Sequence, residues 1–228
     1  MWIGTANLGD LHKRTSWKVE FFCDESRPRS VAAFPLVTIS DIVKERRETL
    51  DPQAQPNVLI NYLGLENVQS TTGHLINFAP RYRKEIKSRS KVFRAGDVLY
   101  GRLRPYLNKV CVADGVTDSG ICSGEFFVLI PDAKRILPHF LRALLSSIYV
   151  HQVVSRLVTG SALPRLQLED LLGIEVPLPS IEEQTDYETY LKEQAEYQKR
   201  LAEELAELPQ KTLSTFIRSL ETGDRPTA

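Results

Sequence analysis

The spacing of apolar residues differs between two parts of the chain. Up to about position 180, short runs of β-branched and aromatic residues alternate with Gly, Asp and Pro, which is typical of strands separated by turns. The runs lie at 36–39, 58–65, 97–103, 109–113, 125–130 and 173–176. The first is either a short strand or the start of a turn, and Pro177 and Pro179 close the last. We interpret the longer runs as strands of one mixed or antiparallel sheet.

Four segments among these runs are expected to be helical. After Pro138, apolar residues recur every three or four positions and form one face; they are Phe140, Leu141, Leu144, Leu145 and Ile148. Shorter helices are expected at 152–157 and 168–172, and Ser40 is placed to cap a brief helix at 41–44. The pattern predicts an α/β (α+β) globular domain at 34–180, preceded by an N-terminal extension at 1–33.

The last segment has the composition of a long exposed helix. Ser180 followed by Glu182 and Glu183 is a helix start signal, and from there steps of four and three form a coiled-coil seam. The seam comprises Tyr187, Leu191, Gln194, Gln198, Leu201, Leu205 and Leu208. Pro209 is expected to kink or restart the helix, and an apolar stripe then continues through Leu213, Phe216, Ile217 and Leu220. We expect a spacer or dimerisation helix at 181–222, which needs a partner helix, and a tail at 223–228.

Composition excludes several classes of protein. With 42% hydrophobic and 25% charged residues among 228, the chain has the makeup of a folded globular protein. It has no apolar run long enough for a membrane span and no signal-peptide pattern at Met1, so we expect a cytoplasmic protein. Cys23, Cys111 and Cys122 lack metal-type spacing, and the four His are scattered, so neither disulfides nor a metal site are expected.

Charge is balanced overall but segregated along the chain. The 29 basic and 29 acidic residues cancel. Positions 81–109, however, hold ten basic and two acidic residues, a net charge of +8, whereas 181–208 hold three basic and nine acidic residues, a net charge of −6. Such a chain is suited to present one face to a polyanion while its other end binds something else.

Six motifs in order resemble one family. They are Phe34-Pro35-Leu36-Val37 with Ile39-Ser40-Asp41-Ile42; Tyr62-Leu63-Gly64-Leu65-Glu66-Asn67-Val68; positions 96–110, which contain Gly101-Arg102-Leu103-Arg104-Pro105-Tyr106; Ser123-Gly124-Glu125-Phe126-Phe127-Val128-Leu129; Thr159-Gly160-Ser161-Ala162-Leu163-Pro164-Arg165-Leu166; and Ile174-Glu175-Val176-Pro177-Leu178-Pro179 leading to Glu182-Glu183-Gln184. Together they resemble the type I restriction-modification DNA specificity subunits over 34–223.

The resemblance implies a target-recognition domain for one half of a bipartite double-stranded DNA site, followed by a long spacer helix. It implies no catalysis and no cofactor, since methyltransferase subunits, and through them the restriction subunit, act as partners. Full-length members carry two recognition domains and two helical regions, whereas this chain has one of each. It is therefore either a half-length subunit that homodimerises through its C-terminal helices or a piece of a longer protein.

Candidate DNA contacts lie mostly in the basic stretch, because Lys and Arg release the counterions that condense on phosphates. Arg102 and Arg104 are two apart at a strand end, hence on one side, and Arg pairs well with guanine. Lys109 contacts phosphate or is structural. Tyr82 is a stacking candidate, whereas Tyr100 is placed in the core. The full set is Arg81, Tyr82, Arg83, Lys84, Lys87, Arg89, Lys91, Arg102, Arg104, Lys109 and Ser161.

The helix contributes a second candidate surface for a partner helix. It consists of Tyr187, Leu191, Leu201, Leu205, Leu208, Phe216 and Leu220.

Other functions find weaker support. Glu85-Ile86-Lys87 has the end of a nuclease motif without a suitable upstream Pro-Asp. Gly120-Ile121-Cys122-Ser123-Gly124 only superficially has the spacing of a nucleophile elbow, and we interpret it as a strand edge. Neither a methyltransferase motif nor a phosphate-binding loop is present. A coiled-coil adaptor or DNA-mimicking regulator of a methyltransferase remains an alternative, and a stand-alone nuclease a weaker one.

Overall fold

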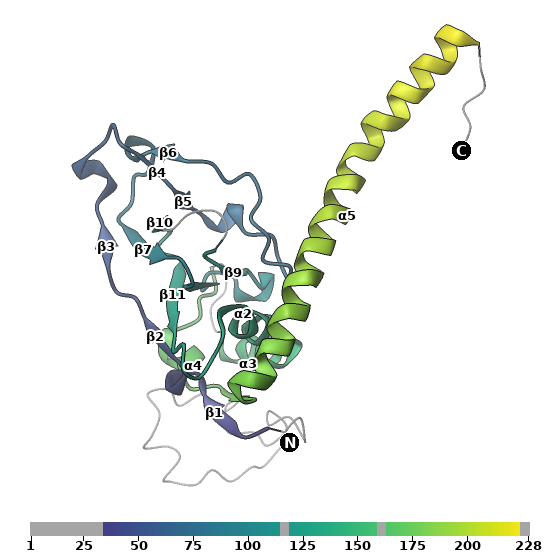
Figure 1. The fold of residues 1–228 in the computed structure, drawn as a ribbon. Coiled ribbons are helices and arrows are strands. Elements are labelled where there is room, and N and C mark those ends of the chain that lie inside the picture. Colours follow the sequence, from purple (N-terminus) through teal and green to yellow (C-terminus); the bar gives the residue numbers. More distant parts are fainter. Residues whose placement is uncertain (1–33, 115–118, 159–162, 224–228) are drawn as a thin grey trace, which may run out of the picture. The chain divides into compact units, whose positions relative to one another are not determined.

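The computed structural model describes residues 34–114, 119–158 and 163–223 (Figure 1). The chain divides into two compact units, 1–188 and 189–228, and each is described by itself. The N-terminal extension predicted at 1–33, the segment Thr159-Gly160-Ser161 and positions 224–228 of the predicted tail lie outside the described residues.

Two four-stranded sheets contain most of the strands described in the first unit. One has the order β2 (Val43–Glu45), β11 (Phe126–Pro131), β8 (Val98–Gly101), β9 (Val110–Val112), and each neighbouring pair is antiparallel. The other has the order β3 (Thr49–Leu50), β7 (Ser90–Arg94), β10 (Ser119–Cys122), β5 (Tyr62–Leu63), and its last pair is parallel. Every residue of β8 is buried, because the sheet is covered on both faces.

Two small antiparallel sheets complete the strands. β1 (Leu36–Thr38) pairs with β12 (Glu175–Pro177), and β4 (Leu59–Ile60) pairs with β6 (Arg81–Tyr82). Figure 1 shows β4 and β6 at the end of the unit opposite β1. Single turns of 3-10 helix lie between strands: η3 (Ile39–Asp41), η4 (Pro52–Ala54), η5 (Leu65–Asn67), η6 (Arg83–Glu85) and η7 (Pro105–Leu107).

Three short helices cover the first sheet. α2 (Pro138–Ser146) contacts β8 and β9, α3 (Ile148–Leu157) packs on η7 and α2, and α4 (Leu168–Leu172) contacts α3. Most of the apolar face predicted after Pro138 enters the main core, where Leu141 and Leu145 are buried and Phe140 and Leu144 pack against them. Ile148, also predicted on this face, instead begins α3 after a break at Ser147 and is 70% exposed. The predicted mixed sheet structure with covering helices and a long C-terminal helix is confirmed.

The prediction of a single sheet was wrong. The run 58–65 divides at Asn61, so that β4 pairs with β6 while β5 joins β10. The brief helix expected at 41–44 is instead η3, which Thr38 precedes as N-cap, followed by strand β2. The partners that decide these outcomes are distant in sequence, so local spacing could not reveal them.

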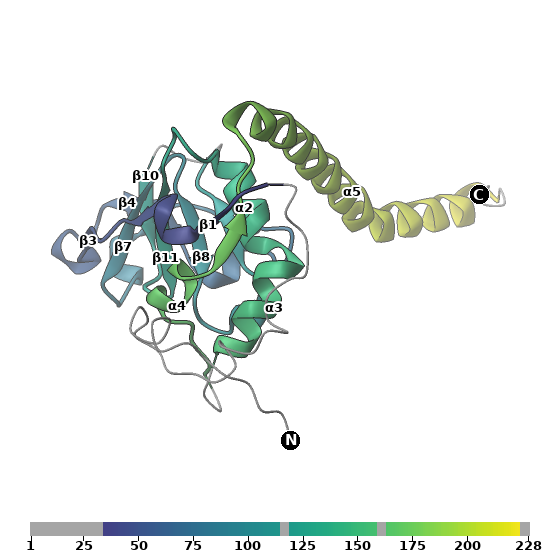
Figure 2. The ribbon, with the colours of Figure 1, turned by 90° about the horizontal axis from the view of Figure 1, so that it is seen from below.

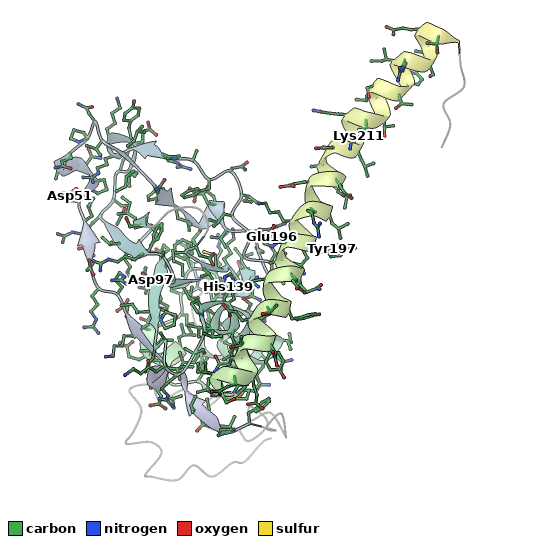
Figure 3. All side chains as sticks on the ribbon, viewed as in Figure 1. Asp51, Asp97, His139, Glu196, Tyr197 and Lys211 are labelled. Atoms are coloured by element: carbon green, nitrogen blue, oxygen red, sulfur yellow. The ribbon has the colours of Figure 1, made fainter. Side chains whose placement is uncertain are left out.

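Asp97 links the two larger sheets. Its carboxylate, labelled in Figure 3, accepts hydrogen bonds from Arg46 Nε at 2.7 Å and Nη2 at 3.0 Å, and from the Arg94 backbone N–H at 2.8 Å. Arg46 follows β2 of the first sheet and Arg94 ends β7 of the second. The buried carboxylate is therefore fully engaged in holding the sheets together.

The long helix α5 (Ile181–Thr222) begins where the sequence predicts. The Ser180 hydroxyl accepts from the Glu183 N–H at 3.3 Å, and the Glu183 carboxylate accepts from the Ser180 N–H at 2.9 Å, which is a capping box. Pro209 lies inside the helix, and Figure 2 shows α5 bending in its C-terminal part, as an internal proline favours. Gly223 ends the helix with φ of 76°.

Two buried polar residues of α5 bind the start of α2. Gln184 Oε1 accepts from the Leu137 N–H at 3.0 Å, and the Glu188 carboxylate accepts from the N–H groups of His139 at 3.3 Å and Phe140 at 2.8 Å. The first N–H groups of a helix have no hydrogen-bond partner within the helix, and Pro138 itself has no N–H group. The first turns of α5 thus complete the N-terminus of α2.

Replacing Gln184 with Leu should therefore destabilise the first unit. The Leu137 N–H and the Arg135 and Pro179 carbonyls, which the Gln184 amide now binds, would lose their partner. Leaving such buried groups unpaired costs about 1–3 kcal/mol. Denaturant unfolding measures the loss. Glu182→Gln, at an exposed position in the same helical turn, is the control. Equal stability of the two variants would contradict the role of Gln184 at the start of α2.

Candidate nucleic-acid interface

The basic stretch at 81–109 folds into β6, η6, β7, β8 and η7. β6 and η6 lie at the end of the first unit opposite β1, next to β4 (Figure 1). Gln53 fixes the turn that follows β6, because its side-chain amide donates to the carbonyl of Ile86 at 2.8 Å. Arg83 Nη1 donates to Gln55 Oε1 at 2.8 Å, which holds the guanidinium. The Arg83 and Lys84 N–H groups donate to carbonyls at 58 and 56, at 3.0 and 2.9 Å, so the backbone that carries these cations is fixed by the segment after η4. Gln53 and Gln55 lie in a stretch with a loop composition, and nothing in that composition indicates these contacts.

Several of the predicted DNA contacts are engaged within the chain. Arg81 lies 3.7 Å from Glu66, and Lys91 lies 3.0 Å from Glu45. Lys109 Nζ donates to the Leu65 carbonyl at 2.7 Å, which fits the structural role left open for it. The net charge of +8 at positions 81–109 is therefore partly neutralised by carboxylates that precede this stretch in the chain.

Other cations of the stretch are exposed. Lys84, Lys87 and Arg89 are exposed, and no ion pair joins them to another described residue. Lys84 Nζ lies 5.1 Å from the ring centroid of Tyr82, which is 42% exposed. A cation beside an exposed aromatic ring offers both a charge for phosphate and a surface for stacking.

Arg102 and Arg104 follow β8, which ends at Gly101, two residues earlier than the run at 97–103 predicted. The segment runs beside 164–166: Arg104 N–H donates to the Pro164 carbonyl at 2.8 Å, and the Arg102 carbonyl accepts from Leu166 N–H at 3.0 Å. Arg104 is exposed and has φ of 48°, an unusual conformation for a residue with a side chain. Such backbone strain is often found at functional sites, and here it precedes η7.

Arg102 is placed differently from the exposed cations. Its guanidinium lies 5.3 Å from the ring centroid of buried Phe127, and its Nε is buried without a hydrogen-bond partner. Its side chain is only partly exposed. The side chain of Arg102 is thereby held against the Phe127 ring.

A nearby ion pair, not identified from the sequence, lies beside Arg102. Arg165 donates to both carboxylate oxygens of Glu125, through Nε at 3.1 and 3.2 Å and through Nη2 at 2.8 Å. The Arg165 hydrogen bonds are the main reason that the pKa of Glu125 is lowered, and the charges of Arg165, Arg102 and Lys91 add to the effect. Both residues lie in motifs of the resemblance, but spacing gave no sign that the motifs meet.

The remaining candidates fall in different environments. Tyr100 is buried in the main core, as expected, and burial raises the pKa of its hydroxyl. Ser161 lies outside the described residues. Cys122, in the elbow-like motif, is buried in β10, where burial raises the pKa of its thiol and so disfavours the thiolate that attacks substrates.

The described residues offer no metal site. No group of His, Cys, Asp and Glu among them is arranged to hold a metal ion. In the same part of the chain, no helix is both long and apolar enough to cross a membrane.

The candidate helix face is exposed in the second unit. Leu201 is 40%, Leu205 66%, Leu208 53%, Phe216 54% and Leu220 68% exposed, and Leu191 is partly exposed. Tyr197 and Lys211 also project from this part of α5 (Figure 3). Tyr187 belongs to the first unit, where its ring contacts Phe140 at a centroid distance of 5.8 Å. An amphipathic helix of this kind is marginal alone, because its apolar face needs cover.

The chain resembles curated specificity subunits in sequence. That of the type I restriction enzyme EcoDI from Escherichia coli is 29% identical over 147 residues, which are 64% of this chain and 30% of that protein. That of the type I enzyme HindI from Haemophilus influenzae is 24% identical over 187 residues, 79% of this chain and 40% of that protein. No protein-family model matches the chain. The resemblance inferred from the six motifs is confirmed.

Solved structures share the fold. A chain from work on assembly and conformational transition of the type I restriction-modification system matches with a TM-score of 0.66 at 24% identity, over 88% of this chain and 52% of that one. The HsdS subunit from Thermoanaerobacter tengcongensis matches with a TM-score of 0.63 at 24% identity, over 84% and 50%. This chain thus spans about half the length of these structures, and less than half of the curated relatives.

The Glu125–Arg165 pair should make stability depend on pH in acid. Because the folded-state pKa of Glu125 is lowered, its contribution is complete above the ordinary glutamate value of about 4.3 and is lost as pH falls through the lowered value. We expect wild type to be more stable than Glu125→Gln at pH 7, with the difference shrinking toward pH 3. Chemical unfolding of both proteins across this range checks it; a difference independent of pH would show that the pair is not the cause.

Proposed function

We propose that the chain recognises one half of a bipartite site in double-stranded DNA as a specificity subunit of a type I restriction-modification system. The observation that carries the proposal is the set of cations left without carboxylate partners at β6–η6–β7 and after β8. The sequence resemblance to specificity subunits supports it independently. Exposed Lys84, Lys87, Arg89 and Arg104 are suited to phosphate contacts, and Arg102 to a base.

The chain acts without catalysis of its own in this proposal. Methyl transfer and DNA cleavage belong to methyltransferase subunits and, through them, to the restriction subunit. The buried thiol of Cys122 supports this view, because it is poorly placed to act as a nucleophile.

The second half of the DNA site requires a second recognition domain. We propose that a second copy of this chain supplies it and pairs through the exposed α5 face in antiparallel orientation. A two-fold axis then relates the two domains, so the bipartite site is a palindrome. At about 1.5 Å per residue, a straight helix of 42 residues is on the order of 60 Å long, which is enough to separate the domains by about one turn of DNA.

Removing the exposed cations should weaken DNA binding in a salt-dependent manner. Lys84→Ala/Lys87→Ala/Arg89→Ala should reduce the slope of log K against log salt by about 0.9 for each phosphate that the protein no longer neutralises. Fluorescence anisotropy with duplex DNA at several salt concentrations measures the slope. Lys44→Ala/Lys134→Ala/Arg156→Ala removes the same charge from exposed positions outside this surface and should leave the slope nearly unchanged. Equal slopes for the two triple variants would contradict the assigned surface.

Polar substitutions on the helix face should separate the two copies. Leu205 and Leu208 lie three apart and are both exposed, so Leu205→Asp/Leu208→Asp places two charges on the seam. We expect a dimer for wild type and a monomer for this variant at micromolar concentration by light scattering. Glu203→Ala/Glu204→Ala, in the same turns, should stay dimeric; a monomeric wild type at high concentration would overturn the homodimer.

A further inference from the structure

The backbone around Arg102 is fixed on both sides. Its N–H donates to the Glu125 carbonyl at 2.8 Å, and its carbonyl accepts from the Leu166 N–H at 3.0 Å. The guanidinium rests 5.3 Å from the Phe127 ring centroid. A side chain held at both backbone and stem loses little freedom on binding, which favours a role in specific recognition.

Glu125 is a carboxylate close to this guanidinium. The two residues are neighbours across the Arg102 N–H to Glu125 carbonyl bond, and the charge of Arg102 contributes to the lowered pKa of Glu125. Even so, no ion pair joins Arg102 to Glu125 or to any other described residue. Arg165 occupies both oxygens of the Glu125 carboxylate, through three hydrogen bonds.

Arg165 is held at this place by the same strand pairing. Leu103 and Arg165 form a β-bridge, so the backbone of Arg165 lies beside the segment that carries Arg102 and Arg104. The planar fork of Arg matches a carboxylate better than a single charge does, and it satisfies both oxygens at once.

We propose that Arg165 is a positioning residue for DNA recognition: by engaging Glu125, it keeps the neighbouring Arg102 guanidinium free to bind DNA. Without Arg165, Glu125 turns to Arg102 and forms an internal ion pair that competes with DNA. Arg165 thus acts through Glu125 and not by touching DNA. This inference rests on the proposed function, because it takes DNA as the ligand of Arg102.

The first test needs no DNA. We expect only a small coupling between Arg102→Ala and Glu125→Gln on the unfolding midpoint in the wild-type background, where the two charges interact but form no ion pair. In the Arg165→Ala background the coupling should become clearly larger, since either substitution removes the new Arg102–Glu125 pair. Equal coupling in both backgrounds would overturn the inference.

The second test uses duplex DNA that the wild-type chain selects from a randomised pool. Arg165→Ala should lower affinity for it on the order of tenfold, the scale of one Arg–base contact. Arg165→Ala/Glu125→Gln should recover most of the loss. In the Arg102→Ala background, Arg165→Ala should have no further effect. Arg156→Ala, which removes an exposed Arg from α3, is the charge-matched control and should bind normally.

The outcomes separate the alternatives. No rescue by Glu125→Gln would mean that Arg165 itself contacts DNA, and a further loss in the Arg102→Ala background would mean that a bare Glu125 simply repels phosphate; both overturn the inference. If the wild-type chain selects no DNA at all, the proposed function fails instead. If wild type selects DNA but Arg102→Ala binds it normally, Arg102 is not a contact and the inference fails alone.

Discussion

The N-terminus of α2 depends on two side chains of another helix. The N–H groups of Leu137, His139 and Phe140 bond to Gln184 and Glu188, which are 0% and 8% exposed. Glu188 also places a carboxylate at the positive end of the α2 dipole. α2 in turn contacts β8, the strand that ends before Arg102. A continuous set of contacts therefore connects the first turns of α5 with the strand that precedes Arg102 and Arg104.

The folded structure pairs part of the basic stretch with carboxylates from elsewhere in the chain. Along the sequence, 81–109 looks uniformly basic, but Glu45 and Glu66 reach Lys91 and Arg81 from outside the stretch. Lys91 also lies 5.4 Å from the Phe127 ring centroid and serves the packing of two sheets. What remains without carboxylate partners is a smaller set of cations, and this set, more than the net charge, supports a DNA-binding surface.

The sequence predicted the features that depend on neighbouring residues. The capping box at Ser180, the apolar face after Pro138 and the helix at 168–172 are all present, because each is decided within a few positions. β7 was missed, since its partners are distant. The segment from Gly120 was interpreted as a strand edge and lies in β10, where a Cβ on Gly120 would lie 2.6 Å from the Asn61 carbonyl oxygen and 2.6 Å from Phe93, so close packing demands glycine. The Glu125–Arg165 pair was invisible for the same reason: two motifs forty positions apart meet only in the fold.

The most direct measurement is a map of DNA methylation in cells that carry this chain with a neighbouring type I methyltransferase subunit. The account predicts a bipartite methylated motif that requires the chain and disappears with Arg102→Ala/Arg104→Ala while the subunits still assemble. A methylation pattern that is the same with and without the chain would contradict it.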